Sequence, residues 1–127
     1  MPILYKDYSS NDNTSLHANF FLQGEASTGD FSEYVIFKCA ATGLTTKLKE
    51  ITYLAYGIGD FSVLLTFSGA QAHPGIYLPK NTSGEFHWGN IPFRNSNTAS
   101  SGDLLLTTFG LTTKKDLGFI YLTGSKS

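Results

Sequence analysis

The side chains able to carry out metal, acid–base or nucleophilic chemistry are scattered along the chain. His17, His73 and His87 lie far apart and form neither an HxH nor an HExxH set, so they lack the spacing of a zinc site. Serine is abundant, but there is no GxSxG nucleophile elbow, which leaves open only a triad assembled from distant residues. We therefore expect a protein that is not an enzyme and that uses no metal and no other cofactor.

The carboxylates and the single thiol also favour structural roles. Asp60 and Asp103 each follow a glycine, where an Asx-type turn is the expected role. The sequence gives only weak support for a calcium site on loop carboxylates, because no DxDxDG spacing occurs. Cys39 is the only cysteine, so the chain forms no internal disulfide. Its place in alternation with Val35 and Phe37 predicts a buried, inert thiol.

Composition narrows the class of protein. A chain of 127 residues makes one domain, and a domain of this size buries roughly two thirds of the surface of its unfolded chain. Charged residues make up 15% of it, against about 25% in typical domains, and its formal net charge is −1. The basic residues form no stripe that would neutralise phosphates, so we expect no nucleic-acid partner. Since neither a signal peptide nor a long apolar run is present, we expect no export and no membrane partner.

The centre of the chain predicts a β-hairpin. Apolar side chains occupy alternate positions in 61–67, the two-residue period of a strand with one buried face. Ile51, Tyr53 and Ala55 share one face of the segment before it, and Gly57 and Gly59 allow a tight reversal between the two segments. We therefore expect residues 48–67 to pair with each other. A second sheet or another chain must then cover their apolar face, because an isolated hairpin is marginal in water.

Short apolar segments separated by turns about every ten residues continue along the chain, with no competing helical period. This spacing predicts an all-β protein, an antiparallel β-sandwich that is jelly-roll-like or a small barrel. Residues 1–19 hold the small apolar cluster Ile3, Leu4 and Tyr5 followed by a polar run, which predicts an extended N-terminal arm or a loosely packed first strand. Residues 20–127 form the single sandwich domain.

The segment from 68 to 98 differs from the rest because three prolines interrupt it. Each proline removes a ladder hydrogen bond, which predicts short edge strands and loops, and we expect a binding surface there. Phe86 is assigned to the core, whereas Trp88 fits the core or an interface about equally. Tyr77, Phe93 and Arg94 are of the residue types enriched at protein interfaces.

From residue 48 onward the chain contains a strand ending LLTF, a Pro/Gly loop, an Asn-rich loop, the segment SGDLLLTTFG and a last strand ending GFIYLTGSKS. This order of features resembles small virion structural proteins of tailed bacteriophages. At 112–116 the chain reads TTKKD, where that pattern has a turn of glycine and serine. The resemblance implies a head decoration, or cement, protein: a β-rich module, commonly a homotrimer, that binds over junctions between major capsid subunits.

Under this interpretation the protein assembles in the host cytoplasm and lies on the outer surface of the phage head. The partners are the major capsid protein and sister copies of the chain. The candidate interface residues are Ile3, Leu4, Tyr5, Tyr77, Trp88, Phe93 and Arg94.

A second interpretation is a glycan-binding or tail-associated module that recognises the host. Rings on loops would stack on a sugar while amides bind its hydroxyls. The residues that would do so are Tyr77, Trp88, Asn90, Asn95 and Asn97.

Overall fold

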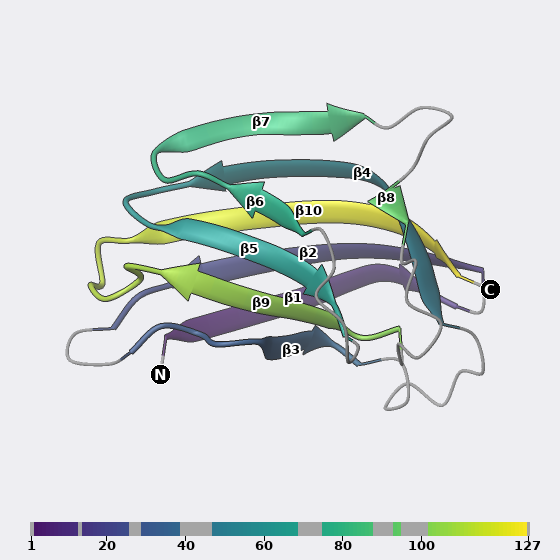
Figure 1. The fold of residues 1–127 in the computed structure, drawn as a ribbon, viewed down its shortest axis with the longest axis horizontal. Coiled ribbons are helices and arrows are strands. Elements are labelled where there is room, and N and C mark those ends of the chain that lie inside the picture. Colours follow the sequence, from purple (N-terminus) through teal and green to yellow (C-terminus); the bar gives the residue numbers. More distant parts are fainter. Residues whose placement is uncertain are drawn as a thin grey trace.

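The chain folds into two antiparallel β-sheets that pack face to face (Figure 1). The computed structural model describes residues 2–12, 14–25, 29–38, 47–68, 75–87 and 102–126, and the backbone of 93–94. Within these ranges no residue is helical. The strands are β1 (Ile3–Asn11), β2 (Ser15–Gln23), β3 (Tyr34–Phe37), β4 (Leu48–Ile58), β5 (Ser62–Phe67), β6 (Ile76–Leu78), β7 (Thr82–His87), β8 (Phe93–Arg94), β9 (Leu104–Phe109) and β10 (Leu117–Lys126).

The larger sheet has six strands in the order β1-β2-β10-β4-β7, with β8 also pairing with β4. The smaller sheet has the order β3-β9-β5-β6, and every strand pair in both sheets is antiparallel. From β2 to β5 the chain changes sheet at each connection. The sequence-based prediction of an all-β antiparallel sandwich is confirmed.

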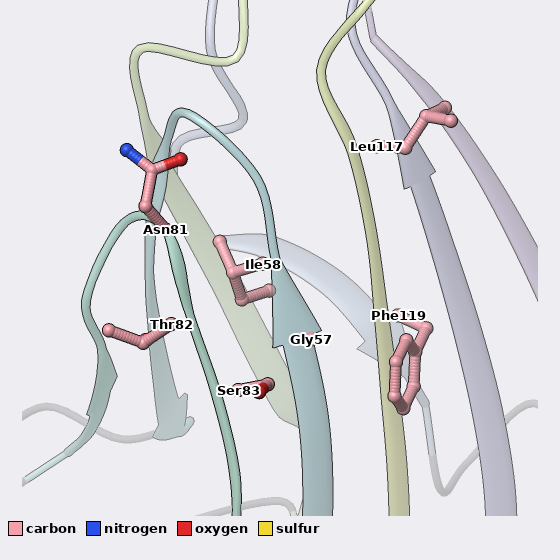
Figure 2. Close-up of a pocket in the computed structure, with 7 residues that line it drawn as sticks. All are labelled: Gly57, Ile58, Asn81, Thr82, Ser83, Leu117 and Phe119. Carbon is pink, nitrogen blue, oxygen red and sulfur yellow. The ribbon is translucent and has the colours of Figure 1, made fainter.

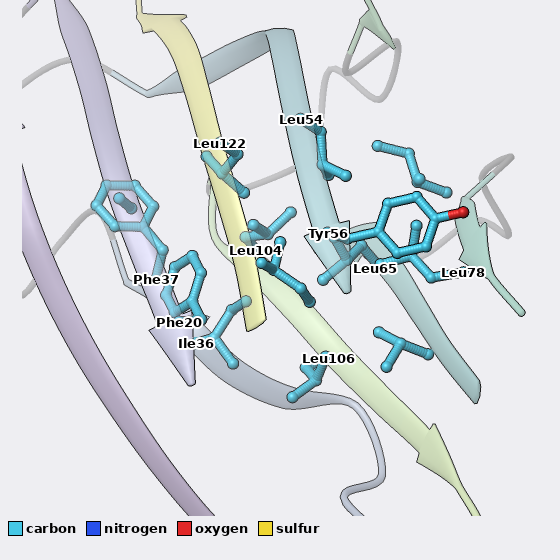
Figure 3. Close-up of a cluster of buried hydrophobic side chains, with 14 of the residues drawn as sticks. Phe20, Ile36, Phe37, Leu54, Tyr56, Leu65, Leu78, Leu104, Leu106 and Leu122 are labelled. Carbon is cyan, nitrogen blue, oxygen red and sulfur yellow. The ribbon is translucent and has the colours of Figure 1, made fainter. Parts of the chain in front are cut away.

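The core fills the space between the sheets (Figure 3). Burial alternates along β2, where Leu16, Ala18, Phe20 and Leu22 point inward. Side chains of β4, β10, β5 and β9 meet them from the two inner faces. Each fully buried Leu or Phe contributes roughly 1.5–3 kcal/mol relative to an exposed one, so this layer is the main source of stability.

The predicted hairpin at 48–67 is wrong in its pairing, although both of its strands exist. β4 lies in the six-stranded sheet between β10 and β7, whereas β5 lies in the four-stranded sheet between β9 and β6. The segment between them is a corner that joins the two sheets. There Gly59 donates its N–H to the Leu117 carbonyl (3.1 Å), and Phe61 donates to the Gly59 carbonyl (2.9 Å). A glycine-rich corner and a hairpin turn look alike in sequence, because both need small residues at a sharp change of direction.

The N-terminal segment is a strand of the larger sheet. β1 pairs with β2 along almost its whole length and forms the edge of the sheet, with a register shift between Tyr8 and Ser10. Leu4 and Tyr8 pack against the core. The Tyr8 hydroxyl donates to the Ile36 carbonyl (3.0 Å), a bond that joins β1 to the smaller sheet, and burial raises the pKa of Tyr8.

Phe86 was assigned to the core from the sequence, and this prediction is wrong. It lies on the edge strand β7, where every residue after Thr82 is exposed, and its ring stacks on Tyr56 with 5.9 Å between the ring centroids. An edge strand has a neighbour on one side only, so fewer side chains are available to cover it.

Candidate interaction surface

The outer face of the six-stranded sheet carries a row of aromatic side chains. Tyr5 of β1, Phe21 of β2 and Phe119 of β10 are direct partners in the strand register and therefore share one face. They are 62%, 53% and 43% exposed, and Leu117, two residues before Phe119, is 59% exposed. We call these four residues the aromatic row. Larger exposed apolar patches are typical of interaction sites, so this row is the candidate surface.

On β4, the next strand of the sheet, the position in line with the aromatic row is a glycine. Gly57 is the register partner of Phe119, and Ser83 of β7 is the partner of Gly57. A Cβ at Gly57 would lie only 2.5 Å from Cε1 of Phe119, so the ring leans over the strand where a side chain is missing. Beyond the ring lies a groove of about 430 Å³ (Figure 2). A second hollow of about 280 Å³ is lined by Phe21, Leu117, Phe119 and two glycines.

A more polar region follows on the same face, two residues further along the strands. Its register partners are Asp7, Asn19, Tyr121, Ala55 and Glu85. The two carboxylates and the amide border the aromatic row on β1, β2 and β7, whereas Tyr121 and Ala55 lie between them.

The β7 end of the polar region holds a small cluster of hydrogen bonds. Nε2 of His87 lies 2.8 Å from Oε2 of Glu85, and the His87 ring lies 4.8 Å from the ring of Tyr53. Hydrogen bonds from His87 and Tyr53 lower the pKa of Glu85. The pKa of Tyr53 is raised, first by desolvation and then by its bond to Glu85. These groups bind each other at the exposed surface and are not gathered around a shared cavity.

The outer face of the four-stranded sheet is less aromatic. Tyr77 of β6 and Phe109 of β9 are 53% and 51% exposed, but they are not register partners. Leu64, the partner of Tyr77, is half-buried. The Thr107 hydroxyl, also on this face, accepts a hydrogen bond from the Glu33 N–H (3.0 Å).

The interface residues expected from the sequence do not lie together on one face of the structure. Tyr5 lies on the outer face of the larger sheet, and Tyr77 lies on the opposite side of the sandwich. Ile3 and Leu4 are half-buried. The expectations for Trp88, Cys39, His73 and the three loop asparagines fall outside the described residues.

Phe93 and Arg94 are described only as backbone. Their strand β8 pairs with Ile51 and Glu50 of β4.

Three members of the aromatic row were missed in the sequence: Phe21, Leu117 and Phe119. The signal for Phe21 was present, since Leu16, Ala18 and Phe20 set the inward phase of β2 and leave position 21 outside. In β10 both phases contain apolar residues, so alternation alone does not show which set faces solvent.

Among the residues that the structure describes, no group of three or more His, Cys, Asp or Glu side chains could hold a metal ion. In the same ranges no helix is long and apolar enough to cross a membrane.

Fold and surface together define the class: a two-sheet antiparallel β-sandwich with an exposed aromatic row on one outer face. Comparison with known proteins finds no family model, no curated protein and no solved structure that is significantly similar to the chain.

Proposed function

We propose that the chain is a non-catalytic structural protein that attaches to a larger protein surface through its aromatic row. The observation that carries this proposal is the register of Tyr5, Phe21 and Phe119, which brings three exposed rings together across three strands. Aromatic anchors clustered near the centre of a patch supply most of the binding energy in protein interfaces. The polar line beginning at Asn19 and Glu85 would form part of the rim.

The resemblance noted in the sequence identifies the larger surface in this proposal. It is the head of a tailed phage, with the chain on the outer surface as a decoration protein over junctions of the major capsid protein. The confirmed all-β sandwich and the low proportion of charged residues support this assignment. Assembly as a homotrimer in the host cytoplasm belongs to the same proposal, and neither nucleic acid nor membrane is a partner.

In the proposed attachment, many copies of the protein each make weak contacts with the shell. A standard interface buries about 800 Å² on each partner, but area alone does not set its affinity. When a trimer binds one shell at several points, the later contacts form at a high effective concentration. Modest attraction at each aromatic row would then hold the protein firmly on the shell.

The test compares one ring on each outer face. Phe21→Ala removes a ring of the aromatic row, and Phe109→Ala removes a similarly exposed ring from the opposite face. We expect Phe21→Ala to weaken binding to purified heads at least tenfold, about 1.4 kcal/mol, in a sedimentation assay, while Phe109→Ala binds as the unmodified chain does. The mass of each variant in solution is measured as well, so that a lost trimer is not mistaken for a lost contact.

Copy number in the mature particle provides the second readout. A ratio to the major capsid protein near one supports a shell component. A few copies per particle would instead support the tail-associated, host-binding alternative. Equal binding by Phe21→Ala and the unmodified chain would contradict attachment through the aromatic row.

A further inference from the structure

The groove beside Phe119 has two chemically different walls. Leu117 and Phe119 of β10 form one side, and Ser83 of β7 and Asn81 of the preceding turn lie on the other, with Gly57 of β4 between them (Figure 2). It is an open, shallow groove of about 430 Å³.

The apolar wall offers a ring that is open to a ligand. Phe119 is 43% exposed, and it leans over Gly57 because that strand position has no side chain. Because the ring of Phe119 lies beside a backbone position without a side chain, another flat apolar surface can stack on it.

The polar wall offers hydrogen-bonding groups held in place by the fold. Asn81 has a φ of 55°, its N–H donates to the Gly59 carbonyl (2.7 Å), and its Nδ2 donates to Oδ1 of Asp60 (3.3 Å). Within the described ranges its Oδ1 has no partner, and neither has the exposed hydroxyl of Ser83. Such preorganised groups lose little freedom when they bind a ligand.

Charge narrows the ligand class, because the residues that line the groove include no ionisable side chain. An anionic ligand would find no countercharge there, and it would be repelled by the carboxylate of Asp60, which is bonded to Asn81. A ligand with an apolar face and a hydroxyl-bearing edge satisfies both walls.

We propose that this groove binds a ring of a neutral saccharide, with the C–H face of the sugar on Phe119 and its hydroxyls on Ser83 and Asn81. The site differs from the loop residues that suggested glycan binding in the sequence, since Tyr77 lies on the opposite side of the sandwich. The groove overlaps the aromatic row at Leu117 and Phe119, but Tyr5 serves only attachment and Ser83 only the groove.

The experiment titrates the full chain with neutral hexasaccharides of glucose, mannose, galactose and N-acetylglucosamine, followed by calorimetry. An acidic hexamer of galacturonate is the charged comparison. We expect millimolar or tighter binding of at least one neutral hexasaccharide and weaker binding of the acidic one. Phe119→Ala and Ser83→Ala should each lower the affinity, the former by about tenfold or more.

Tyr5→Ala and Phe109→Ala are the matched controls, since each changes an exposed aromatic side chain outside the groove, and both should bind sugar normally. Circular dichroism of every variant checks that it is folded. The proposal is overturned if no neutral hexasaccharide binds, or if Phe119→Ala and Ser83→Ala bind as the unmodified chain does. Loss of head binding in Ser83→Ala without any sugar binding would overturn it too, because the groove would then belong to the protein interface.

Discussion

The two outer faces of this sandwich use their exposed positions differently. On the four-stranded sheet, the Thr107 hydroxyl accepts a bond from the chain's own backbone, and Leu64 is half-buried. On the six-stranded sheet, the rings of Tyr5 and Phe21 project from adjacent strands and are more than half exposed. The exposed rings of the four-stranded sheet are not register partners, so only the six-stranded sheet gathers such rings into one row.

The aromatic row differs from the exposed rings of the other face in how the strands place it. Its rings come from neighbouring strands at one register level, a geometry that a regular antiparallel sheet provides without any loop. On the other face, Tyr77 belongs to the three-residue strand β6, and Phe109 lies at the end of β9. The aromatic row thus lies on strands of nine or ten residues, whereas Tyr77 lies on a strand of three.

The largest predicted effect tests whether the aromatic row is a surface or part of the fold. Phe20 and Phe21 are neighbours on β2, but Phe20 is 1% exposed and points into the core. Phe20→Ala should lower the free energy of unfolding by about 3–5 kcal/mol, because it leaves a cavity. Phe21→Ala should change it by less than about 0.5 kcal/mol. Urea unfolding followed by circular dichroism measures both values.

If Phe20→Ala and Phe21→Ala lowered the free energy of unfolding by similar amounts, Phe21 would be a structural residue of the outer face. The contrast between the two outer faces would then no longer hold. Phe109→Ala serves as the reference for an exposed ring on the other sheet, and it too should remain within about 0.5 kcal/mol of the unmodified chain.

The fold class was predictable because the relevant signal is local. Alternation in 61–67 correctly predicted β5, and short segments separated by turns about every ten residues correctly indicated an all-β sandwich. Strand pairing was not predictable in this way. The partners of β4 are β10 and β7, and Tyr121 pairs with Ala55 although 66 positions separate them in the chain (121 − 55). Nothing within residues 48–67 distinguishes a corner between sheets from a turn within one.

The interaction surface was only partly predictable for a related reason. Tyr5 was chosen by residue type, and it is indeed exposed, but its neighbours in the aromatic row come from distant parts of the sequence. Leu117 and Phe119 lie two positions apart, as core residues on one face of a strand do. Only the burial of Ile120 and Leu122 shows that the face carrying Leu117 and Phe119 points outward. Residue type predicts membership of an interface less well than the phase of the strand does.

The second prediction tests the smaller sheet, where we expect exposed polar groups to be structural. Asp30 accepts hydrogen bonds through Oδ1 from the Leu111 N–H (2.7 Å) and the Thr108 hydroxyl (2.9 Å), and through Oδ2 from the Gly110 N–H (3.0 Å). Asp30→Ala should cost about 1–3 kcal/mol, since it leaves these donors without their acceptor. Hydrogen exchange should show the amides of Gly110 and Leu111 losing protection first.

Asp7→Ala is the matched control, because it removes a carboxylate from the outer face of the larger sheet. Its effect on stability should stay within about 0.5 kcal/mol. If Asp30→Ala were equally neutral, the carboxylate of Asp30 would not hold the end of β9, and the structural use of polar groups beside the smaller sheet would lose its support.

The smallest predicted effect concerns the turn that sets β1 beside β2 and so brings Tyr5 next to Phe21. Oδ1 of Asp12 accepts bonds from the Thr14 N–H (2.8 Å), the Thr14 hydroxyl (2.8 Å) and the Ser15 N–H (2.9 Å), and these bonds lower its pKa to about 2. A pKa lowered by folding means that the carboxylate stabilises the fold above its unfolded pKa near 3.8, and that this contribution fades as the pH falls to about 2. Asp12→Asn should therefore be slightly less stable than the unmodified chain at pH 7, and the two should converge near pH 2 in urea unfolding. A gap of constant size from pH 7 to pH 2 would mean that the charge of Asp12 does not hold the turn, and β1 would then owe its place in the aromatic row to pairing with β2 alone.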